Sequence, residues 1–294
     1  MARAIVEEAE ALLDQEIKVL DKGFVRLVDY LGGDDRIVQS ARVSYGAGTK
    51  SFRQDRGLIH YLMRNEHTSP FEQVLLTFHC KMPIFVARQW VRHRTARLNE
   101  ISGRYSIMRD EFYLPQASEV RFQSERNKQG RADETVPLDE AMKIIAALEE
   151  DQKKLYSHYE QLLEKNVARE LARINLPLAL YTEWYWNIDL HNLFHFLGVR
   201  MEAHAQYEIR VFAEALARCA KAVAPIAYEA FEEHVLGAVR FSRGECRALS
   251  ALLDGREHDL EGRSLAVFED KLEKVKAAGC FEEPEEPKLP APRE

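Results

Sequence analysis

Residues 73–94 read QVLLTFHCKMPIFVARQWVRHR. This stretch predicts a strand directly before a helix, which is the starting point for the fold. Its first half alternates, with Val74, Leu76, Phe78 and Cys80 on one face, which predicts a half-buried strand over Gln73–Cys80. Pro83 is tolerated in a first helical turn, so we predict a helix over Ile84–Arg94.

The same criteria extend outward along the chain. They predict an amphipathic helix within Met1–Leu20, strands over Phe24–Leu31 and Leu180–Asn187, and helices over Asp35–Arg42, Gly57–Asn65, Pro137–Arg173, Leu190–Val199 and Glu202–Pro225. Asp189 is placed to cap the helix that follows it, and Arg109–Thr135 is predicted to be a polar excursion. A few strands among long helices, without regular alternation of strand and helix, predict an α+β domain.

Composition narrows the class of protein. The chain has 294 residues, 41 Lys+Arg against 48 Asp+Glu and a net charge of -7, as in ordinary folded proteins. The mild acidity argues against a surface that binds nucleic acid throughout. We find no apolar run of ~20 residues and no signal peptide, so we expect a cytoplasmic protein without a membrane partner.

The recognisable nucleotide and metal motifs give weak signals. The chain has no GxGxxG and no HExxH, and Gly48-Thr49-Lys50-Ser51 lacks the earlier glycine of a P-loop. His191 and His195 lie one helical turn apart, but no third ligand is evident, so we predict no metal site. The cysteines are scattered, and for Cys80 and Cys219 we expect a structural role.

The densest chemical feature is residues 92–106, RHRTARLNEISGRYS, with four arginines, one histidine and several short hydrogen-bonding side chains. Guanidinium groups match phosphate oxygens bidentately. The apolar approach over Ile84–Val91 should bury much of the helix, and arginines clustered near buried surface need anionic partners. We therefore predict a site for a phosphorylated ligand, with a solvated basic face as the alternative. Arg173 and Arg200 could converge on the same anion.

This segment resembles the signature of flavin-dependent thymidylate synthases, Arg-His-Arg-x-x-Ser-x-Asn-Glu-x-Ser-x-Arg, except that Arg97 stands where serine is usual. Companion segments resemble the family in family order: ARVSY at 41–45, HTSPFE at 67–72, PIFVARQW at 83–90, Ala172-Arg173 with Leu176-Pro177, and Arg200 with HAQ at 204–206. The resemblance spans residues 24–235 and implies a synthase domain there. It leaves 1–23 as an N-terminal helical extension, 236–280 as a C-terminal helical extension and 281–294 as a flexible tail.

The resemblance implies an α+β fold with a small, mostly antiparallel sheet flanked by long helices. It implies a homotetramer with active sites shared between subunits. Its implied activity converts dUMP and methylenetetrahydrofolate into dTMP and tetrahydrofolate, with FAD reduced by NADPH as the hydride source. Such an enzyme must position flat ligands and bind several phosphates, and the arginine-rich segment suits that task.

The resemblance also implies roles for individual residues. Arg200 is the implied catalytic residue, whose charge stabilises the deprotonated, enolate-like uracil ring. Ser102 has no evident adjacent base, so we expect it to hydrogen-bond rather than to attack. The implied dUMP ligands are Gln89, Trp90, Val91, Arg92, Glu100, Ile101, Ser102, Gly103, Arg104, Arg173 and Arg200. The implied FAD ligands are Ser69, Arg92, His93, Arg94, Glu100, Asp189, Leu190, His191 and His195.

His67 and Tyr105 are implied neighbours of the flavin and the folate, through ring stacking. Asp189 and His195 stand where some relatives carry asparagine. Because a carboxylate repels a phosphate, we expect Asp189 to cap its helix or to meet the ribose or the flavin ring.

Two other classes compete with the synthase. A protein that recognises the phosphates of nucleic acid would use the same arginines, with Trp90, Tyr105 and Tyr113 as stacking platforms. A metal-dependent nucleotide hydrolase would use His191, His195 and His204. The long signature, its ordered companions and the acidic total charge favour the synthase, which binds no nucleic acid.

Overall fold

The computed structural model describes residues 5–43, 52–125 and 130–278. The chain divides into two compact units, the first ending at Leu236 and the second beginning at Gly237. The predicted tail 281–294 and the segment Gly48–Ser51 lie outside the described residues.

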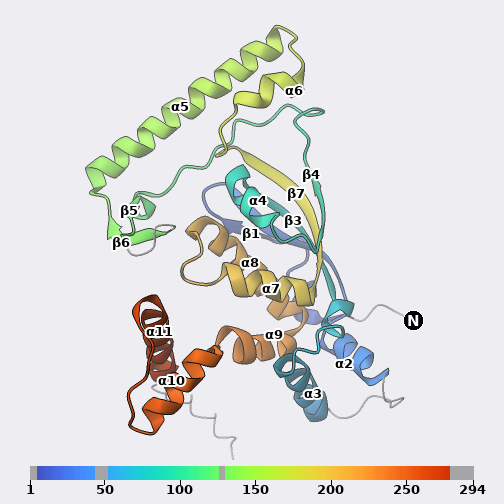
Figure 1. Ribbon diagram of the computed structural model, residues 1–294. Helices are drawn as coiled ribbons and strands as arrows, with labels where there is room; N and C mark the ends of the chain where they lie inside the picture. Colours follow the sequence, from blue (N-terminus) through green and yellow to red (C-terminus); the bar gives the residue numbers. More distant parts are fainter. Residues whose placement is uncertain (1–4, 44–51, 126–129, 279–294) are drawn as a thin grey trace, which may run out of the picture. The chain divides into compact units, whose positions relative to one another are not determined.

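A five-stranded antiparallel sheet organises the first unit, in the order β1-β2-β3-β7-β4 (Figure 1). Its strands are β1 (Glu16–Val19), β2 (Gly23–Leu31), β3 (Leu75–Pro83), β4 (Arg97–Glu100) and β7 (Tyr181–Asp189). The register pairs Phe78 of β3 with Trp186 of β7. With the long helices around it, this sheet confirms the predicted α+β fold.

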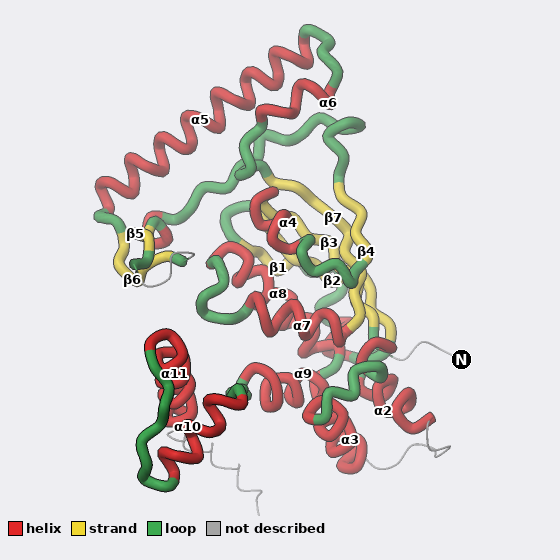
Figure 2. The backbone as a smooth tube through the Cα atoms, in the orientation of Figure 1, coloured by secondary structure: helices red, strands yellow, loops and turns green. Residues whose placement is uncertain are grey.

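Helices pack on one face of the sheet, where α4, α7 and α8 lie together (Figures 1 and 2). The helices of the first unit are α1 (Glu7–Glu10), α2 (Asp34–Arg42), α3 (Phe52–Arg64), α4 (Ile84–Trp90), α5 (Leu138–Glu164), α6 (Arg169–Ala172), α7 (Leu190–Arg200), α8 (Tyr207–Val223) and α9 (Pro225–Phe231). Short 3-10 turns are η2 (Phe71–Gln73), η3 (Ala117–Glu119) and η4 (Arg173–Asn175), and η5 (Glu232–Leu236) is a π-helix.

The main core lies between the sheet and these helices. The predicted alternation is confirmed, because Val74, Leu76, Phe78 and Cys80 are all fully buried. At its centre the Trp90 indole meets Trp184 and Trp186 edge to face, with ring centroids 5.4 and 5.2 Å away. Aromatic pairs in this geometry add to the free energy gained by burial. They anchor the last turn of α4, and the arginine-rich segment leaves the core from that point.

A second, smaller core holds the polar excursion against α5. Tyr159 and Tyr156 of α5 bond the main chain of Met108, the first accepting from its N–H at 3.0 Å and the second donating to its carbonyl at 2.9 Å. The excursion also contains a two-stranded sheet of β5 (Arg121–Gln123) and β6 (Arg131–Thr135), which the sequence reading did not anticipate.

The N-terminal helix predicted within Met1–Leu20 was wrong. Within residues 5–20 the helical part is the single turn α1, and β1 follows as an edge strand of the sheet. Asp14 and Leu20 flank β1 with positive φ angles of 57° and 58°, a conformation that interrupts a helix. Pairing with β2 therefore outweighed the local helical pattern.

The long helix predicted over Pro137–Arg173 is confirmed over most of its length, but α5 ends at Glu164. Asn166 adopts a φ of 55°. The N–H groups of Asn166 and Val167 bond back to the carbonyls of Leu163 and Leu162, both at 2.9 Å. This Schellman motif ends α5 and lets the chain turn into α6.

The second unit, as described from Gly237 to Ala278, contains α10 (Arg243–Leu253) and α11 (Gly262–Ala278). Ser242 and Glu245 form a capping box at the start of α10. The Lys271 ammonium of α11 lies 2.7 Å from both oxygens of Glu245, which ties the two helices together.

Candidate functional site

The arginine-rich segment runs along the edge of the sheet rather than as a continued helix. The predicted helix over Ile84–Arg94 ends at Trp90, and Arg97–Glu100 form β4 beside β7. Beyond β4 the Ile101 N–H donates to the Glu183 carbonyl at 2.9 Å. The Glu100 carboxylate accepts from the Thr182 hydroxyl at 2.6 Å. The sheet therefore fixes the backbone and one carboxylate of this segment.

Arg200 lies at the centre of the best-defined group of predicted residues. Its Nε donates to His93 Nε2 at 3.2 Å, and its Nη2 donates to the main-chain oxygen of Gln89 at 3.3 Å. The His93 ring also lies beside that of His195, with centroids 5.6 Å apart. The last turns of α4 and α7 are thus joined by side chains predicted for dUMP and for FAD.

The protonation of this group follows from its surroundings. Burial first, and then the nearby Arg200 and His195, lower the pKa of His93 from 6.5 to about 4. A neutral His93 can accept the Arg200 hydrogen bond at Nε2, which places its own proton on Nδ1. Burial and the adjacent Arg92 lower the pKa of Arg200, whose guanidinium nevertheless stays charged at neutral pH.

A second group forms around the turn after β4. A Cβ on Gly103 would meet Arg173 Cδ at 3.0 Å and Met108 Sδ at 2.9 Å, so glycine allows the Arg173 side chain to cross this turn. Arg104 forms an ion pair with Glu170 at 3.1 Å, and Arg169 donates to the Tyr105 carbonyl. The turn is therefore clamped by α6 and η4.

Ser102 has a structural part in this turn. Its carbonyl accepts from the N–H groups of Tyr105 and Ser106, both at 3.0 Å, and its hydroxyl accepts from the Arg104 N–H at 3.3 Å. Its hydroxyl contacts the main chain rather than a histidine or a carboxylate, as expected for a hydrogen-bonding serine.

A third group follows α3. The N–H of His67 bonds the Leu62 carbonyl at 2.9 Å and Glu66 has a φ of 56°, so a Schellman motif ends α3 and presents an exposed His67. The His67 ring lies edge-on to Tyr61, 5.7 Å away. Ser69 is exposed on the same loop. Within the described part of one chain, no hydrogen bond or ion pair joins His67 or Ser69 to Arg200.

Asp189 caps α7, as predicted. Its Oδ1 accepts from the Asn192 N–H at 2.9 Å, and its Oδ2 accepts from the Asn192 side-chain amide at 2.7 Å. His191 is half-buried and His195 is exposed on the same helix.

Two predicted ligands need correction. The side chains of Trp90 and Leu190 are fully buried in the main core, so neither can meet a ligand at the surface. Large apolar side chains gain more free energy from burial in the core than from a position at a hydrated site, which explains why both are buried. Contact with dUMP or FAD at these positions is left to the main chain.

The remaining predicted ligands lie at or near the surface. Val91 is half-buried, and Arg92, Arg94, Arg104 and Tyr105 are exposed. Arg92 and Arg94 make no ion pair with any residue in the ranges 5–43, 52–125 and 130–278. Two guanidinium groups without an acidic partner in the described ranges, on one short segment, are suited to bind anionic groups such as phosphates.

Gln206, for which the sequence predicted no role, bonds one of the predicted ligands. Gln206 Oε1 accepts a hydrogen bond from Gln89 Nε2, although the two residues are far apart in the chain. The signal was present in the HAQ segment, to which no role had been assigned. Gln206 also lines a cavity of about 610 Å³ with Arg131, Tyr207 and Arg210, beside the β5-β6 hairpin.

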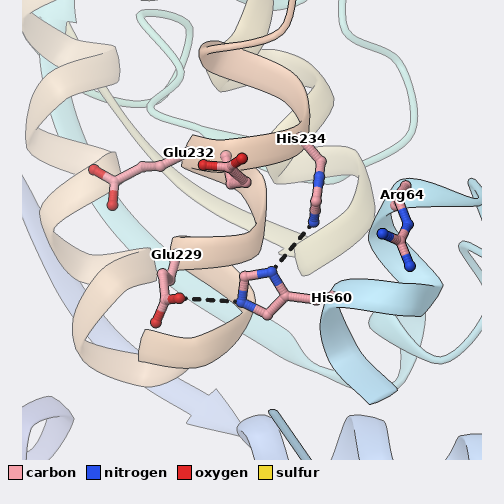
Figure 3. Close-up of a pocket in the computed structure, with 6 residues that line it drawn as sticks. His60, Arg64, Glu229, Glu232 and His234 are labelled. Carbon is pink, nitrogen blue, oxygen red and sulfur yellow. Dashed lines mark hydrogen bonds and ion pairs between the residues drawn. The ribbon is translucent and has the colours of Figure 1, made fainter. Parts of the chain in front are cut away.

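A different pocket, of about 570 Å³, contains none of the predicted ligands. Figure 3 shows His60 of α3 pointing to Glu229 of α9 and to His234 of η5. His60 Nε2 lies 3.1 Å from the Glu229 carboxylate, and His60 Nδ1 lies 3.2 Å from His234 Nε2. Because these groups bond one another, they link α3 to the end of the first unit.

The two buried cysteines have a structural role. Cys80 and Cys219 are buried, and burial raises the pKa of Cys80 well above its usual value and that of Cys219 to about 12. A thiol held protonated is a poor nucleophile.

Two features of the described residues bear on the alternatives. They contain no group of three or more His, Cys, Asp or Glu arranged to hold a metal ion, so His191, His195 and His204 are not gathered into one. In the same ranges, no helix has both the length and the apolarity needed to span a bilayer.

Comparison with known proteins agrees with the geometry. Residues 26–226 match the family described as thymidylate synthase complementing protein, and residues 239–278 match the thymidylate synthase ThyX C-terminal domain. A flavin-dependent thymidylate synthase of Treponema denticola is 60% identical over 260 residues, covering 88% of this chain and 98% of that protein. One from Rickettsia prowazekii is 50% identical over 282 residues, covering 91% of this chain and 96% of the relative.

Solved structures extend the likeness to the fold. The UMP/dUMP methylase PolB of Streptomyces cacaoi, crystallised with 5-Br dUMP, has 31% sequence identity and a TM-score of 0.68. The match covers 75% of this chain and 99% of that one. The chain belongs to the flavin-dependent thymidylate synthase family, whose members use FAD to convert dUMP into dTMP.

Proposed function

We propose that dUMP binds at the group formed by Arg200, His93 and Gln89, and that the turn around Gly103 and Arg173 holds the same nucleotide. The observation that carries this assignment is the convergence on Arg200 of residues from α4 and α7. The PolB structure, which holds 5-Br dUMP, supports a uracil nucleotide as the ligand of this fold.

Arg200 has the geometry of an electrostatic catalyst. Its Nε and Nη2 are held by His93 and Gln89, which leaves Nη1 to face a ligand. Methyl transfer to C5 requires electron density to build up on the uracil ring, and a fixed guanidinium stabilises that charge without reorganising. A neutral His93 orients the guanidinium and adds no second positive charge.

The exposed guanidinium groups of Arg92 and Arg94 are suited to the phosphates of dUMP and FAD. When bound and reduced by NADPH, FAD would supply the hydride that completes the methyl group derived from methylenetetrahydrofolate. His67, Ser69, His191 and His195 are the proposed flavin neighbours, and Asp189 serves them by fixing the start of α7. Because no hydrogen bond or ion pair joins His67 or Ser69 to Arg200 within the described part of one chain, we propose sites shared between the subunits of a homotetramer.

The test is Arg200→Ala, with the exposed Arg256→Ala of the second unit as a matched loss of one arginine. We expect Arg200→Ala to lower kcat for dTMP formation by about 10²- to 10³-fold, the usual effect of removing one donor that stabilises transition-state charge. The flavin absorbance of the purified protein should be retained in both variants. A kcat within threefold of the wild type for Arg200→Ala would contradict the assignment.

A further inference from the structure

We propose that Glu208 is a positioning residue for dUMP recognition: it orients the side-chain amides of Gln206 and Gln89 so that Gln89 turns its carbonyl oxygen toward the nucleotide. This inference rests on the proposed dUMP site and adds which end of the Gln89 side-chain amide faces the nucleotide.

The first step is the carboxylate itself. Glu208 lies in the first turn of α8, and its side chain is 4% exposed. Its Oε1 accepts from the Tyr113 hydroxyl at 3.1 Å and forms an ion pair with Arg131. The oxygens of a carboxylate accept hydrogen bonds, and this one lies beside a guanidinium and at a helix N-terminus, which both interact favourably with negative charge.

The Glu208 carboxylate also fixes the orientation of the Gln206 side-chain amide. Glu208 Oε2 receives a hydrogen bond from Gln206 Nε2 at 2.8 Å. The reversed amide would set an oxygen against a carboxylate, which is repulsive, so Gln206 must direct its nitrogen to Glu208. Its oxygen then faces Gln89, whose Nε2 donates to it.

The third step reaches the ligand. Once Gln89 Nε2 is committed to Gln206, the opposite end of the same amide, Oε1, is turned away from Gln206 and can accept from a ligand. Gln89 belongs to the dUMP site because its main-chain oxygen bonds Arg200 at 3.3 Å. An amide oxygen there matches a donor on the nucleotide, either the imide N–H of uracil or a sugar hydroxyl, and not a phosphate oxygen.

The network also connects the excursion to the site. Tyr113 and Arg131 come from the polar excursion and β6, whereas Gln206 and Glu208 come from the start of α8. Each oxygen of one carboxylate serves a different part of the molecule: Oε1 holds the excursion and Oε2 orients the amides. This division allows the two roles to be separated by mutation.

The experiment is a double-mutant cycle on the FAD-loaded enzyme. Gln206→Leu, Glu208→Gln and Gln89→Ala are made singly, and the first two are each combined with Gln89→Ala. The dUMP Kd is measured by calorimetry, and kcat and KM are measured for dTMP formation. Tyr113→Phe is the matched control, because it removes a donor to Oε1 and leaves Oε2 with its partner. Because Gln206 is exposed, Gln206→Leu keeps the test available if Glu208→Gln fails to fold.

We expect each single variant to raise the dUMP Kd and KM about five- to tenfold, the equivalent of about one hydrogen bond, with kcat within twofold. Combined with Gln89→Ala, the other two changes should cause no further loss, because they act through Gln89. Tyr113→Phe should leave the Kd within twofold of the wild type.

Three results would overturn the inference. Losses that multiply in the double variants would mean that Glu208 and Gln206 act independently of Gln89. An equal loss in Tyr113→Phe would indicate general support of the fold. An unchanged dUMP Kd in Gln89→Ala would mean that the Gln89 side-chain amide does not bind the nucleotide. If Arg200→Ala still abolished turnover in that last case, the proposed function would stand without this inference.

Discussion

Arg97 is the residue at which the signature departs from its family, and its surroundings show what the exchange does. It lies exposed on β4, and its Nη1 donates to the Asn187 side chain at 3.3 Å. Asn187 in turn donates to the Thr77 hydroxyl at 2.9 Å. The longer side chain has therefore found a partner on the neighbouring strand.

We predict that Arg97→Ser retains flavin binding and turnover. Removing one exposed hydrogen bond should change the free energy of unfolding by no more than about 0.5 kcal/mol. The measurements are the ratio of flavin to protein absorbance, kcat for dTMP formation and a denaturant midpoint. Loss of both flavin and turnover would instead show that Arg97 has been recruited to the site.

His93 gives the site a defined dependence on pH. Its pKa is lowered by burial from 6.5 to about 4, so the unfolded chain binds a proton more readily than the folded one between these values. The stability that the neutral ring contributes is present above pH 6.5 and is lost as the pH falls toward 4. Protonation would also set a cation against Arg200.

The check is the melting temperature of the wild type and of His93→Asn between pH 4 and pH 7. We expect the wild type to lose more stability than the variant as the pH falls through this window, because only the wild type must keep a buried imidazole neutral. Parallel curves for the two proteins would contradict the prediction.

At the residue scale, the sequence predicted interactions between residues that lie close together in the chain. Asp189 caps α7 through Asn192, three positions on, and that pattern is legible in the chain. The pairing of Gln89 with Gln206 bridges a large sequence separation, and no local pattern contains it. The Trp90 indole turned inward because the core could bury it, although the residues after it face solvent.

At the scale of elements, strands were predicted where one face is buried. β3 and β7 alternate between core and surface, and both were found within a few residues of their bounds. β4 is exposed at every position, so its sequence carries no alternation, and pairing with β7 alone makes it a strand. An edge strand of this kind becomes visible only when its partner is known.

The start of α9 shows a helix cap supplied from a distant element. Asp34 of α2 accepts from the N–H groups of Ile226 and Ala227 at 2.8 and 2.9 Å, so one carboxylate satisfies two donors of the first turn. Burial raises the pKa of Asp34 to about 6, against the lowering effect of these two bonds. Ala224, the residue before α9, has no side chain that could do this.

We predict that Asp34→Ala lowers the free energy of unfolding by about 1–2 kcal/mol at neutral pH, as for the loss of a helix cap. The neighbouring Asp35→Ala, at an exposed position of the same helix turn, is the control and should change it by less than about 0.5 kcal/mol. Both values come from urea denaturation. Equal effects would show that the acidic first turn of α2 matters, and not the cap.

At the scale of the whole molecule, the net charge is negative, whereas the proposed ligand site carries exposed positive charges. The net charge is -7, yet Arg92 and Arg94 stand exposed and lack acidic partners within the described residues. Some other arginines of the first unit are paired, as Arg104 is with Glu170. Such a local concentration attracts small anionic ligands while the rest of the surface repels polyanions.

The predicted ligands of one chain form groups around Arg200, around Gly103 with Arg173, and around His67, and within the described ranges no hydrogen bond or ion pair joins Arg200 to His67. On the proposed assignment a single flavin and nucleotide use residues from all three groups, and a second copy of the chain would supply one of them. We therefore predict that dilution to the monomer removes both FAD and activity. Mass photometry over a dilution series, with flavin fluorescence and dTMP formation on the same samples, tests this. Reconcentration should restore all three signals if the subunits remain folded, whereas a monomer that keeps its flavin and its turnover would show that one chain builds the whole site.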